Sequence, residues 1–334
     1  MIRSTGLLAL PSCMRQTTPP SRAGIRFEII MNHDTISIFF AVDPPWFQHL
    51  CVLIVSILEC NPDEHFAFHI MTNQNVVVEK EKIISLKNVC QNCEFHFISM
   101  DETQFAGLPI SRLPHQIYYR LVIPDIAPEL ERAIYIDADI VCNIALREIW
   151  ETPLDGYYVA GVEDMLSRSH LPYLAAIGLP PAHKYINAGM LVMNLKKWRD
   201  DDAVRRCFEY VHDMADVLKY GDQDAINHVF QGRIKLLDQK WNYTTCDSDY
   251  SENRPKQQMG HFTGKRKPWK FFKYCTHMSS RLYFKHLKKT PYRNFMIKHQ
   301  VFGILRLLEG CEPYIERKLR KLRIKFGIYP PRKR

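Results

Sequence analysis

The chain has 334 residues, of which 46% are hydrophobic and 24% charged. This composition is typical of a globular protein and excludes a largely disordered one. The formal net charge of +9 is concentrated at one end, because residues 270–334 carry 18 Lys and Arg against 3 Asp and Glu, while the remainder carries 27 against 33. A strongly basic end on a mildly acidic body predicts a separate function for that end.

The first residues show no targeting or membrane-spanning signal. The apolar patch within residues 1–34 is too short for a signal-peptide core. No run in the chain reaches the roughly 18–20 uncharged residues that span a bilayer. We expect residues 1–34 to be a poorly ordered lead-in, with Met31 as an alternative start of translation.

From residue 35 the pattern alternates between strands and helices. Residues 35–42 form an apolar run rich in β-branched and aromatic side chains, which predicts a buried parallel strand. Further strands are expected over 65–72, 94–99 and 132–137, and helices over 46–60, 76–90 and 115–123, the last one ended by Pro124. The alternation predicts an α/β fold, with an open, mostly parallel sheet covered by helices on both faces.

In such sheets, ligands bind beyond the carboxyl ends of the strands. Two of the predicted ends carry aspartates, Asp43 after the first strand and Asp137 after the fourth. No glycine-rich dinucleotide fingerprint follows the first strand, and no P-loop motif occurs anywhere in the sequence. Dinucleotide and P-loop functions therefore lose their usual support.

The most informative motif is Asp137-Ala138-Asp139, directly after an apolar strand. In extended chain, side chains two residues apart point to the same side, so both carboxylates can face one cation. Two hard oxygen ligands suit Mg²⁺ or Mn²⁺, which also bridge the oxygens of a diphosphate. A pair of solvated turn aspartates is the alternative, and the hydrophobic strand before the motif favours the metal site.

A second candidate segment is HFTGKRKPW, residues 261–269. His261 is a candidate third ligand, because imidazole nitrogen favours transition metals such as Mn²⁺ over Mg²⁺. Gly264 allows the backbone to approach a phosphate closely, and Lys267 offers it a positive charge. Taken alone, the segment also fits a basic surface loop.

Two further segments lie between these motifs. Asn187-Ala188-Gly189 reads as a turn directly before an apolar strand, and Asp222-Gln223 as an acidic helix start where Asp222 caps the helix. Each of them, taken singly, fits an ordinary structural role at least as well as a functional one.

In this order and at these separations, the four segments resemble glycosyltransferase family 8, which includes bacterial lipopolysaccharide core galactosyl- and glucosyltransferases and the glycogenins. The resemblance covers about residues 35–275 and extends to Arg120 in YYRL and to the phrases LREIW and NLKKWR. It implies a GT-A fold, a UDP-sugar donor, Mn²⁺ (with Mg²⁺ as the alternative) and retention of the anomeric configuration.

The resemblance also implies roles for the matching residues. Asp137, Asp139 and His261 would hold the metal on the UDP diphosphate, and Asp43 would bind the uracil, although the following Pro44-Pro45-Trp46 departs from the family pattern. The other implied donor-site residues are Arg120, Ala138, Gly264 and Lys267 around the nucleotide, with Asp164, Asn187, Asp222 and Gln223 around the sugar, the last three being the candidate catalytic group.

The sequence shows no glutamate at an obvious nucleophile position, and Gln223 is a poor nucleophile. We therefore expect same-face attack, in which the leaving phosphate accepts the proton of the acceptor. In that mechanism Asp222 orients the donor rather than acting as a base. Positive charge near the diphosphate, such as that of Lys267, would stabilise the departing group.

The predicted domains are a lead-in (1–34), a GT-A catalytic domain (35–275) made of a nucleotide-binding half (35–140) and an acceptor- and metal-closing half (141–275), and a basic tail (276–334). In the tail, Ile315, Leu319, Leu322 and Phe326 recur at helical spacing and are flanked by cations. This pattern predicts an amphipathic helix that lies on an anionic membrane, and a solvated basic helix packed on the body is the alternative.

Cysteine usage indicates the redox compartment. The ten cysteines have irregular spacing, and several stand in apolar runs, such as Cys51, Cys142 and Cys207. We expect these three to be buried, reduced thiols, which favours a reducing cytoplasm over a disulfide framework. Cys90 and Cys93 form a single C-x-x-C without a second pair, which gives a zinc site little support.

Together, the sequence predicts a hexosyltransferase that moves glucose or galactose from a UDP-hexose to a saccharide or glycolipid acceptor, such as the lipopolysaccharide core. We expect it to be cytoplasmic, peripheral on the inner face of the membrane, with no nucleic-acid partner. Three alternatives stay open: a glycogenin-like self-glucosylating protein, a nucleic-acid-binding protein that acts through its basic tail, and a sugar-nucleotide-binding protein without activity.

Overall fold

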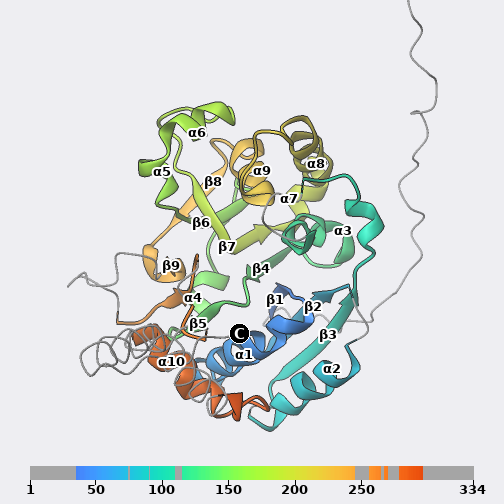
Figure 1. Cartoon of the computed structure of the whole chain (residues 1–334), viewed down its shortest axis with the longest axis vertical. Coiled ribbons are helices and arrows are strands. Elements are labelled where there is room, and N and C mark those ends of the chain that lie inside the picture. Colours follow the sequence, from blue (N-terminus) through green and yellow to red (C-terminus); the bar gives the residue numbers. More distant parts are fainter. Residues whose placement is uncertain are drawn as a thin grey trace, which may run out of the picture. The chain divides into compact units, whose positions relative to one another are not determined.

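The computed structural model describes residues 35–73, 76–89, 91–109, 115–244, 256–264, 267–269 and 278–295. The predicted lead-in, residues 1–34, lies outside this part. The described residues form a seven-stranded sheet in the order β3-β2-β1-β4-β7-β6-β8 and a three-stranded sheet in the order β5-β10-β9 (Figure 1). The large sheet consists of β1 (Ile36–Ala41), β2 (Phe66–Thr72), β3 (Cys93–Ser99), β4 (Arg132–Ile136), β6 (Val159–Glu163), β7 (Ile186–Asn194) and β8 (Ile234–Leu237). The small one consists of β5 (Ile140–Cys142), β9 (Tyr243–Thr244) and β10 (Met259–His261).

Most strand pairs of the large sheet are parallel, as predicted. Strand β1 pairs in parallel with β2 and β4, β2 with β3, and β6 with β8. Strand β7 is the exception and runs antiparallel to both β4 and β6. The α/β fold with a mostly parallel sheet is confirmed. The antiparallel β7 gives the sheet a direction change that the strand pattern does not predict.

Helices cover both faces of the large sheet, because its strands are apolar on both sides. On β1, Ile36, Ile38 and Phe40 face a core shared with α1, whereas Phe39 faces a second core shared with α7, α8 and α9. The helices are α1 (Phe47–Cys60), α2 (Val77–Ile84), α3 (Ile123–Ile126), α4 (Arg147–Trp150), α5 (Leu166–Ser169), α6 (Leu171–Ala176), α7 (Leu195–Asp200), α8 (Ala203–Asp213), α9 (Gly221–Val229) and α10 (Met278–Leu287). Short 3₁₀ helices are η1 (Pro44–Trp46), η2 (Ser85–Asn88), η3 (Glu102–Phe105), η4 (His115–Val122) and η5 (Gln239–Asn242).

The helix expected over 115–123 differs from its prediction in two ways. It is a 3₁₀ helix, η4, and the chain continues directly into α3 rather than stopping at Pro124. Pro124 stands in the first turn of α3, where the missing N–H would have had no intrahelical partner and the fixed backbone angle suits a helix. Pro124 therefore helps to begin a helix here, and the prediction that it ends one is wrong.

Part of the predicted basic tail packs on the body. Helix α10 lies against α1, where His49 Nδ1 and the Tyr283 hydroxyl are 2.7 Å apart, and Lys289 Nζ is 2.7 Å from Glu59 Oε1. The Tyr283 and Leu287 side chains are buried. The remaining tail, with its predicted stripe of Ile315, Leu319, Leu322 and Phe326, lies outside the described residues. No helix of the described part is both long enough and apolar enough to span a membrane.

The cysteines of the described part are free thiols, as predicted for the three that stand in apolar runs. Cys51, Cys142 and Cys207 are buried, and so is Cys93. Burial raises the pKa of the Cys142 and Cys207 thiols well above its usual range. These side chains therefore act as small hydrophobic groups in the core.

Candidate active site

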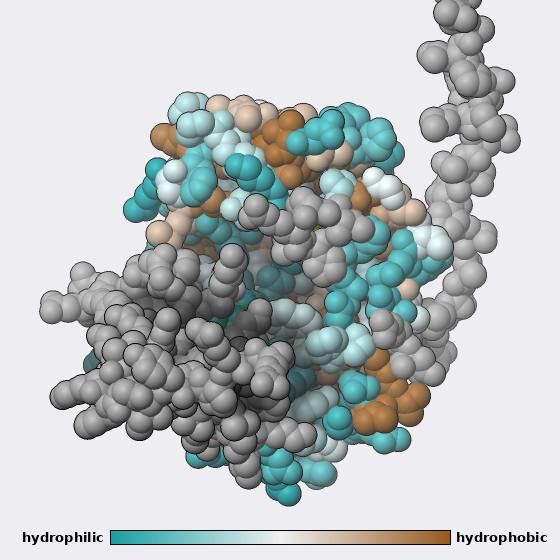
Figure 2. Space-filling model, in the orientation of Figure 1, coloured by the Kyte–Doolittle hydropathy of each residue, from teal (hydrophilic) through white to brown (hydrophobic). Residues whose placement is uncertain are grey.

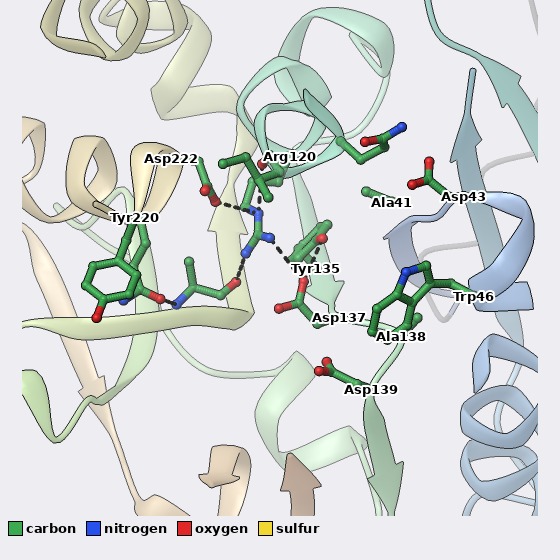
Figure 3. Close-up of a pocket in the computed structure, with 14 residues that line it drawn as sticks. Ala41, Asp43, Trp46, Arg120, Tyr135, Asp137, Ala138, Asp139, Tyr220 and Asp222 are labelled. Carbon is green, nitrogen blue, oxygen red and sulfur yellow. Dashed lines mark hydrogen bonds and ion pairs between the residues drawn. The ribbon is translucent and has the colours of Figure 1, made fainter. Parts of the chain in front are cut away.

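A cleft of about 250 Å³ lies beyond the carboxyl ends of β1 and β4. Asp43 and Trp46 stand at one end of it, Tyr220 and Asp222 stand at the other, and Asp137 and Asp139 lie between them (Figure 3). Charged and aromatic side chains thus converge where an open α/β sheet binds its ligands. The cleft is lined by Ala41, Asp43, Trp46, Gln116, Ile117, Arg120, Tyr135, Asp137, Ala138, Asp139, Ala188, Tyr220, Asp222 and Gln223.

Three predicted metal ligands meet at this cleft. One ligand atom each from Asp137, Asp139 and His261 lies within 4.8 Å of the others. His261 Nε2 is 3.1 Å from Asp139 Oδ1 and 4.0 Å from Asp137 Oδ2. The pairing of β10 with β5 produces this arrangement, because it sets His261 opposite Ile140, the residue after Asp139.

The residues present fit a divalent cation. Two carboxylates and one imidazole nitrogen suit Mn²⁺, and also Mg²⁺ with a poorer third ligand. Space for them depends on Gly189 of β7, since a Cβ atom there would lie 2.3 Å from His261 Cε1 and 2.9 Å from Asp137 Oδ2. Only a glycine at this position leaves the imidazole and the carboxylate where they are.

The Lys267 side chain is buried next to this cluster. Its ammonium group forms an ion pair with Asp139 and donates a hydrogen bond to the carbonyl oxygen of Phe262. Burial opposes the ionisation of Asp139, but the neighbouring His261 and Lys267 side chains outweigh it and hold the pKa of Asp139 well below its usual range. Asp139 is therefore a carboxylate near neutral pH, as a metal ligand has to be.

Arg120 joins the metal ligands to the opposite end of the cleft. Its buried guanidinium lies 3.0 Å from Asp137 Oδ1 and 2.8 Å from Asp222 Oδ2, and donates to the carbonyl oxygen of Ala188 (Figure 3). The same group stacks over the Tyr135 ring, 4.2 Å from its centroid. The Tyr135 hydroxyl donates to Asp137 Oδ1 at 2.8 Å. The orientation of Asp137 is thus fixed by two donors.

Asp222 is buried in the first turn of α9. Burial raises the pKa of Asp222 to about 7, and nearby Asp137 adds to this rise, while Arg120 opposes it. The carboxyl group of Asp222 therefore changes charge near neutral pH. It is close to the candidate metal ligands, yet it is paired with a cation rather than with another carboxylate.

Two amide side chains at this end of the cleft are held by hydrogen bonds. Gln223 Oε1 accepts the N–H of Ala188 at 2.9 Å, and its Nε2 donates to the Tyr185 hydroxyl at 3.2 Å. Asn187 Nδ2 donates to Asp164 Oδ2 at 2.8 Å. Asn187 lies inside β7, so the prediction of an Asn-Ala-Gly turn before the strand is wrong. The backbone is extended there because Asn187 pairs with Val162 of β6.

The structure brings most of the predicted site residues together. Asp43, Arg120, Asp137, Ala138, Asp139, Asp222 and Gln223 line the cleft. His261 and Lys267 reach it by contacting Asp139. Asn187 lies two residues before Gly189 and holds Asp164 beside the strand, so Asp164 is one side chain further away. Gly264 is not among the lining residues, and its positive φ of 69° marks the turn that follows β10.

Several residues of the site carry no functional signal in the sequence. The two prolines after Asp43 begin η1, and this turn places Trp46 at the cleft, across from Asp43 (Figure 3). Tyr135 reads as an ordinary strand aromatic, and Tyr220 as a loop residue. Asn242, which lies 2.8 Å from His261 Nδ1, stands in a segment without periodicity or charge pattern. Of these residues, only Trp46 could have been predicted to lie at the site, because it stands three residues after an aspartate at the end of a strand.

Comparisons with known proteins agree with this geometry. The family model described as glycosyl transferase family 8 matches residues 37–272. The chain is 27% identical over 285 residues to a lipopolysaccharide 1,2-glucosyltransferase of Escherichia coli, covering 80% of this chain and 82% of that protein. It is 24% identical over 254 residues to the lipopolysaccharide 1,3-galactosyltransferase of Salmonella typhimurium, covering 71% and 73%.

Solved structures show the same fold. The galactosyltransferase LgtC, in complex with donor and acceptor sugar analogues, superposes with a TM-score of 0.68 at 24% identity, over 77% of this chain and 96% of that chain. The bifunctional glycosyltransferase WbbM superposes with a TM-score of 0.70 at 20% identity, over 82% of this chain and 53% of that one. With a family model matched along most of its length and a GT-A fold, the chain is a glycosyltransferase that belongs to family 8.

Proposed function

We propose that this glycosyltransferase transfers glucose or galactose from a UDP-hexose to a saccharide acceptor, of the lipopolysaccharide-core type or a related glycolipid, with Mn²⁺ as its metal. The observation that carries the proposal is the Asp137, Asp139 and His261 cluster at the middle of a cleft whose far end holds Asp43 and Trp46. The glucosyl- and galactosyltransferases among the relatives support the choice of donor sugar and acceptor.

The Asp43 end of the cleft suits a pyrimidine base. Asp43 Oδ1 is buried without a hydrogen-bond partner in the described part of the chain, so it can accept from an N–H group such as the imide of uracil. The indole of Trp46 lies across from it and offers an apolar surface to the base. Burial, and to a lesser degree Glu102, raises the pKa of Asp43. A base that donates to this carboxylate would favour its charged form.

The middle of the cleft suits a diphosphate. When bound, the cation would offset the negative charge that builds on the diphosphate as the sugar leaves. Asp137, Asp139 and His261 would hold it, and the imidazole favours Mn²⁺ over Mg²⁺. The ammonium of Lys267 adds a second positive charge at Asp139. Arg120 keeps Asp137 oriented toward the same point.

The Asp222 end would hold the sugar, and its contacts favour same-face attack. The Asp222 carboxyl is paired with Arg120, and both ends of the Gln223 amide are engaged, so neither side chain is free to act as a nucleophile. We propose that the bond from the anomeric carbon to the β-phosphate oxygen breaks while a bond to the acceptor oxygen forms on the same face. The acceptor proton passes to the departing phosphate. Trapping a glycosyl adduct on Asp222 or Gln223 in the intact enzyme would contradict this mechanism.

The test is UDP release by the purified protein with Mn²⁺ and a panel of UDP-sugars, with and without EDTA. We expect release from one UDP-hexose, its loss with EDTA, and its loss in Asp139→Asn. Asp200→Asn is the matched control, because Asp200 is an exposed aspartate that forms an ion pair with Lys196 on the same helix. No release from any donor, and no shift in melting temperature with UDP, would refute the proposal. Intact-mass measurement distinguishes transfer to an added acceptor from glycogenin-like self-transfer.

We further propose that the protein works as a cytoplasmic enzyme at the inner membrane face. Residues 278–295 contain no acidic residue and expose basic side chains. Lys82 of α2 lies 4.5 Å from the centroid of the Tyr292 ring, so this segment adjoins α2, where Val77 and Val78 are 53% and 55% exposed. Figure 2 shows a hydrophobic patch at its lower right, over α2. The exposed basic residues are Arg281, Lys285, Lys288, Lys289 and Arg293.

Cosedimentation with vesicles tests the membrane proposal. Each cation near an anionic surface contributes about 1 kcal/mol, so Lys288→Glu should weaken binding to phosphatidylglycerol-containing vesicles several-fold or more. Lys235→Glu is the control, because Lys235 is a half-buried lysine in β8, at the opposite edge of the large sheet from β3. Equal loss in both variants, or equal binding to neutral vesicles, would contradict a specific basic face.

A further inference from the structure

A chain of four hydrogen-bonded side chains runs from the sugar end of the cleft to the back of the metal site. It consists of Asp164, Asn187, Asn242 and His261. We propose that Asn242 is a positioning residue, which fixes the proton of His261 on Nδ1 and so leaves the Nε2 lone pair to face Asp137 and Asp139. The inference rests on the proposed function in one respect, namely that these three side chains hold a cation.

The orientation of the Asn187 amide is fixed from both sides. Its Oδ1 lies 2.9 Å from the backbone nitrogen of Gly189, which can only donate, and its Nδ2 lies 2.8 Å from a carboxylate oxygen of Asp164. The other oxygen of Asp164 accepts the backbone N–H of Leu166 at 2.9 Å. If the Asn187 amide were flipped, its NH₂ group would face the N–H of Gly189 and its oxygen would face the Asp164 carboxylate, and neither pair could form a hydrogen bond.

This fixed amide determines the next one. Asn187 Oδ1 also lies 2.8 Å from the Asn242 amide, so Asn242 has to donate through Nδ2. Its Oδ1 then faces His261 Nδ1 at 2.8 Å. An amide oxygen only accepts, so Nδ1 has to carry a proton. Asn242 and His261 are 2% and 4% exposed, which leaves little room for water to substitute for a mismatched partner.

The consequence reaches the metal ligands. A histidine protonated on Nδ1 and neutral overall presents its lone pair through Nε2, the atom that lies 3.1 Å from Asp139 Oδ1. The three ligand atoms then all offer lone pairs to one point, which is the arrangement that a divalent cation requires. Without Asn242, the ring would be free to place its proton on Nε2, where it would donate to Asp139.

Asn187 also connects two parts of the site. Its side chain lies next to Gly189, whose missing Cβ leaves room for His261, and it links Asp164 to Asn242. Neither Asp164 nor Asn187 would touch the cation. A substitution at either residue is nevertheless expected to disturb the orientation of His261, through Asn242. Asn242 itself is placed by η5, which Asp238 begins by accepting the backbone N–H of Lys240 at 2.8 Å.

The first test needs no variant. In the full-length protein labelled with ¹⁵N-histidine, an imidazole ¹H–¹⁵N correlation spectrum reports which ring nitrogen of His261 is protonated. The signal is assigned by its absence in His261→Gln. We expect a protected proton on Nδ1, both without metal and with Mg²⁺ and UDP. A proton on Nε2 with a bare Nδ1, in either state, would overturn the inference.

The second test uses Asn242→Leu and Asn242→Asp. Mn²⁺ binding followed by electron paramagnetic resonance in the presence of UDP should weaken roughly 10- to 100-fold in Asn242→Leu. Binding should weaken less in Asn242→Asp, which keeps an acceptor for Nδ1 but replaces the donor to Asn187 Oδ1 with a second acceptor. The matched control is Asn61→Leu, since Asn61 is an equally buried asparagine bonded to Ile57 and Leu146. That variant should melt at a lower temperature without weaker Mn²⁺ binding.

The outcomes separate this inference from the proposed reaction. If no UDP-hexose is cleaved, but the proton lies on Nδ1 and Asn242→Leu weakens Mn²⁺ binding, the proposed reaction fails and the inference holds. If Asn242→Leu folds and binds Mn²⁺ like the wild type, the inference fails whatever the activity. If that variant does not fold, the spectrum of the wild-type protein decides.

Discussion

Gly189→Ala tests whether the metal site depends on a missing side chain. Gly189 lies in β7, and its φ is not positive, so alanine fits the backbone there. The new Cβ would lie 2.3 Å from His261 Cε1, against about 3.5 Å for an ordinary carbon contact. It would also lie 2.9 Å from Asn187 Oδ1 and from Asp137 Oδ2. The imidazole therefore has to move by about 1 Å.

The size of this displacement sets the expected effect. Metal–ligand distances tolerate changes of about 0.2 Å, so a histidine moved by about 1 Å is no longer a good ligand. We expect Mn²⁺ affinity in the presence of UDP to fall at least 10- to 100-fold, the range for disturbed ligand support. Overpacking should also lower the unfolding free energy of the metal-free protein by about 1–3 kcal/mol.

Both quantities can be measured on one preparation. Electron paramagnetic resonance follows Mn²⁺ binding, and denaturant titration gives the unfolding free energy. Gly161→Ala is the matched control, because the three atoms nearest to a Cβ there belong to Ile186 and Leu191, the closest of them at 2.6 Å, and none to a metal ligand. It should lose stability and keep Mn²⁺ affinity. Wild-type Mn²⁺ affinity in a folded Gly189→Ala protein would refute the reasoning.

Three other predictions follow from single contacts. The pKa of Asp222, raised to about 7 mainly by burial, means that the folded state holds an extra proton below that pH, so this contribution to stability is lost as the pH rises through about 7. In Asp222→Asn, the decline of the unfolding free energy between about pH 4 and about pH 7 should be shallower than in the wild type, by at most about 1.4 kcal/mol per pH unit. Equal slopes of the two proteins in denaturant titrations over this pH range would contradict the prediction. The Lys267 ammonium forms an ion pair with Asp139 and so competes with a metal ion for this carboxylate. In the absence of UDP, Lys267→Met should therefore bind Mn²⁺ roughly tenfold more tightly than the wild type. Weaker Mn²⁺ binding would argue against this competition. Tyr283→Phe removes the hydroxyl contact with His49 and should lower the unfolding free energy by about 1 kcal/mol. Tyr283→Ala also removes the buried ring and should lower it by about 3–5 kcal/mol. Equal losses in the two variants would mean that packing of this ring on α1 matters little.

The early strands could be predicted from the sequence because burial on both faces leaves a continuous apolar run. Strands β1, β2, β3 and β4 begin and end within about one residue of their predicted limits. The direction of β7 could not be predicted, because an apolar strand pairs equally well in either sense until its partners are known. Because strand partners cannot be read from the sequence, Asn187 is predicted to be a turn residue, although it lies within strand β7.

The candidate site also contains residues that could be predicted from the sequence and residues that could not. Asp137 and Asp139 are visible in the sequence because charges directly after a buried strand have few structural roles. Asn242 and Gly189 are not visible, since what each one does depends on contact with His261, which is distant from both in the sequence. Residue type alone does not show that a glycine is there to make room, or that an amide fixes a proton.

The ligand cluster also connects the two sheets. Asp137 follows β4 of the seven-stranded sheet, whereas His261 ends β10 of the three-stranded one. A cation held by both would fasten the small sheet to the large one, and at a concentration 100 times its dissociation constant it would add about 2.7 kcal/mol to that attachment. By thermodynamic linkage, anything that loosens β9 or β10 should register as weaker metal binding, even where it contacts no ligand. A chelator should in turn act on this protein as a mild, local denaturant.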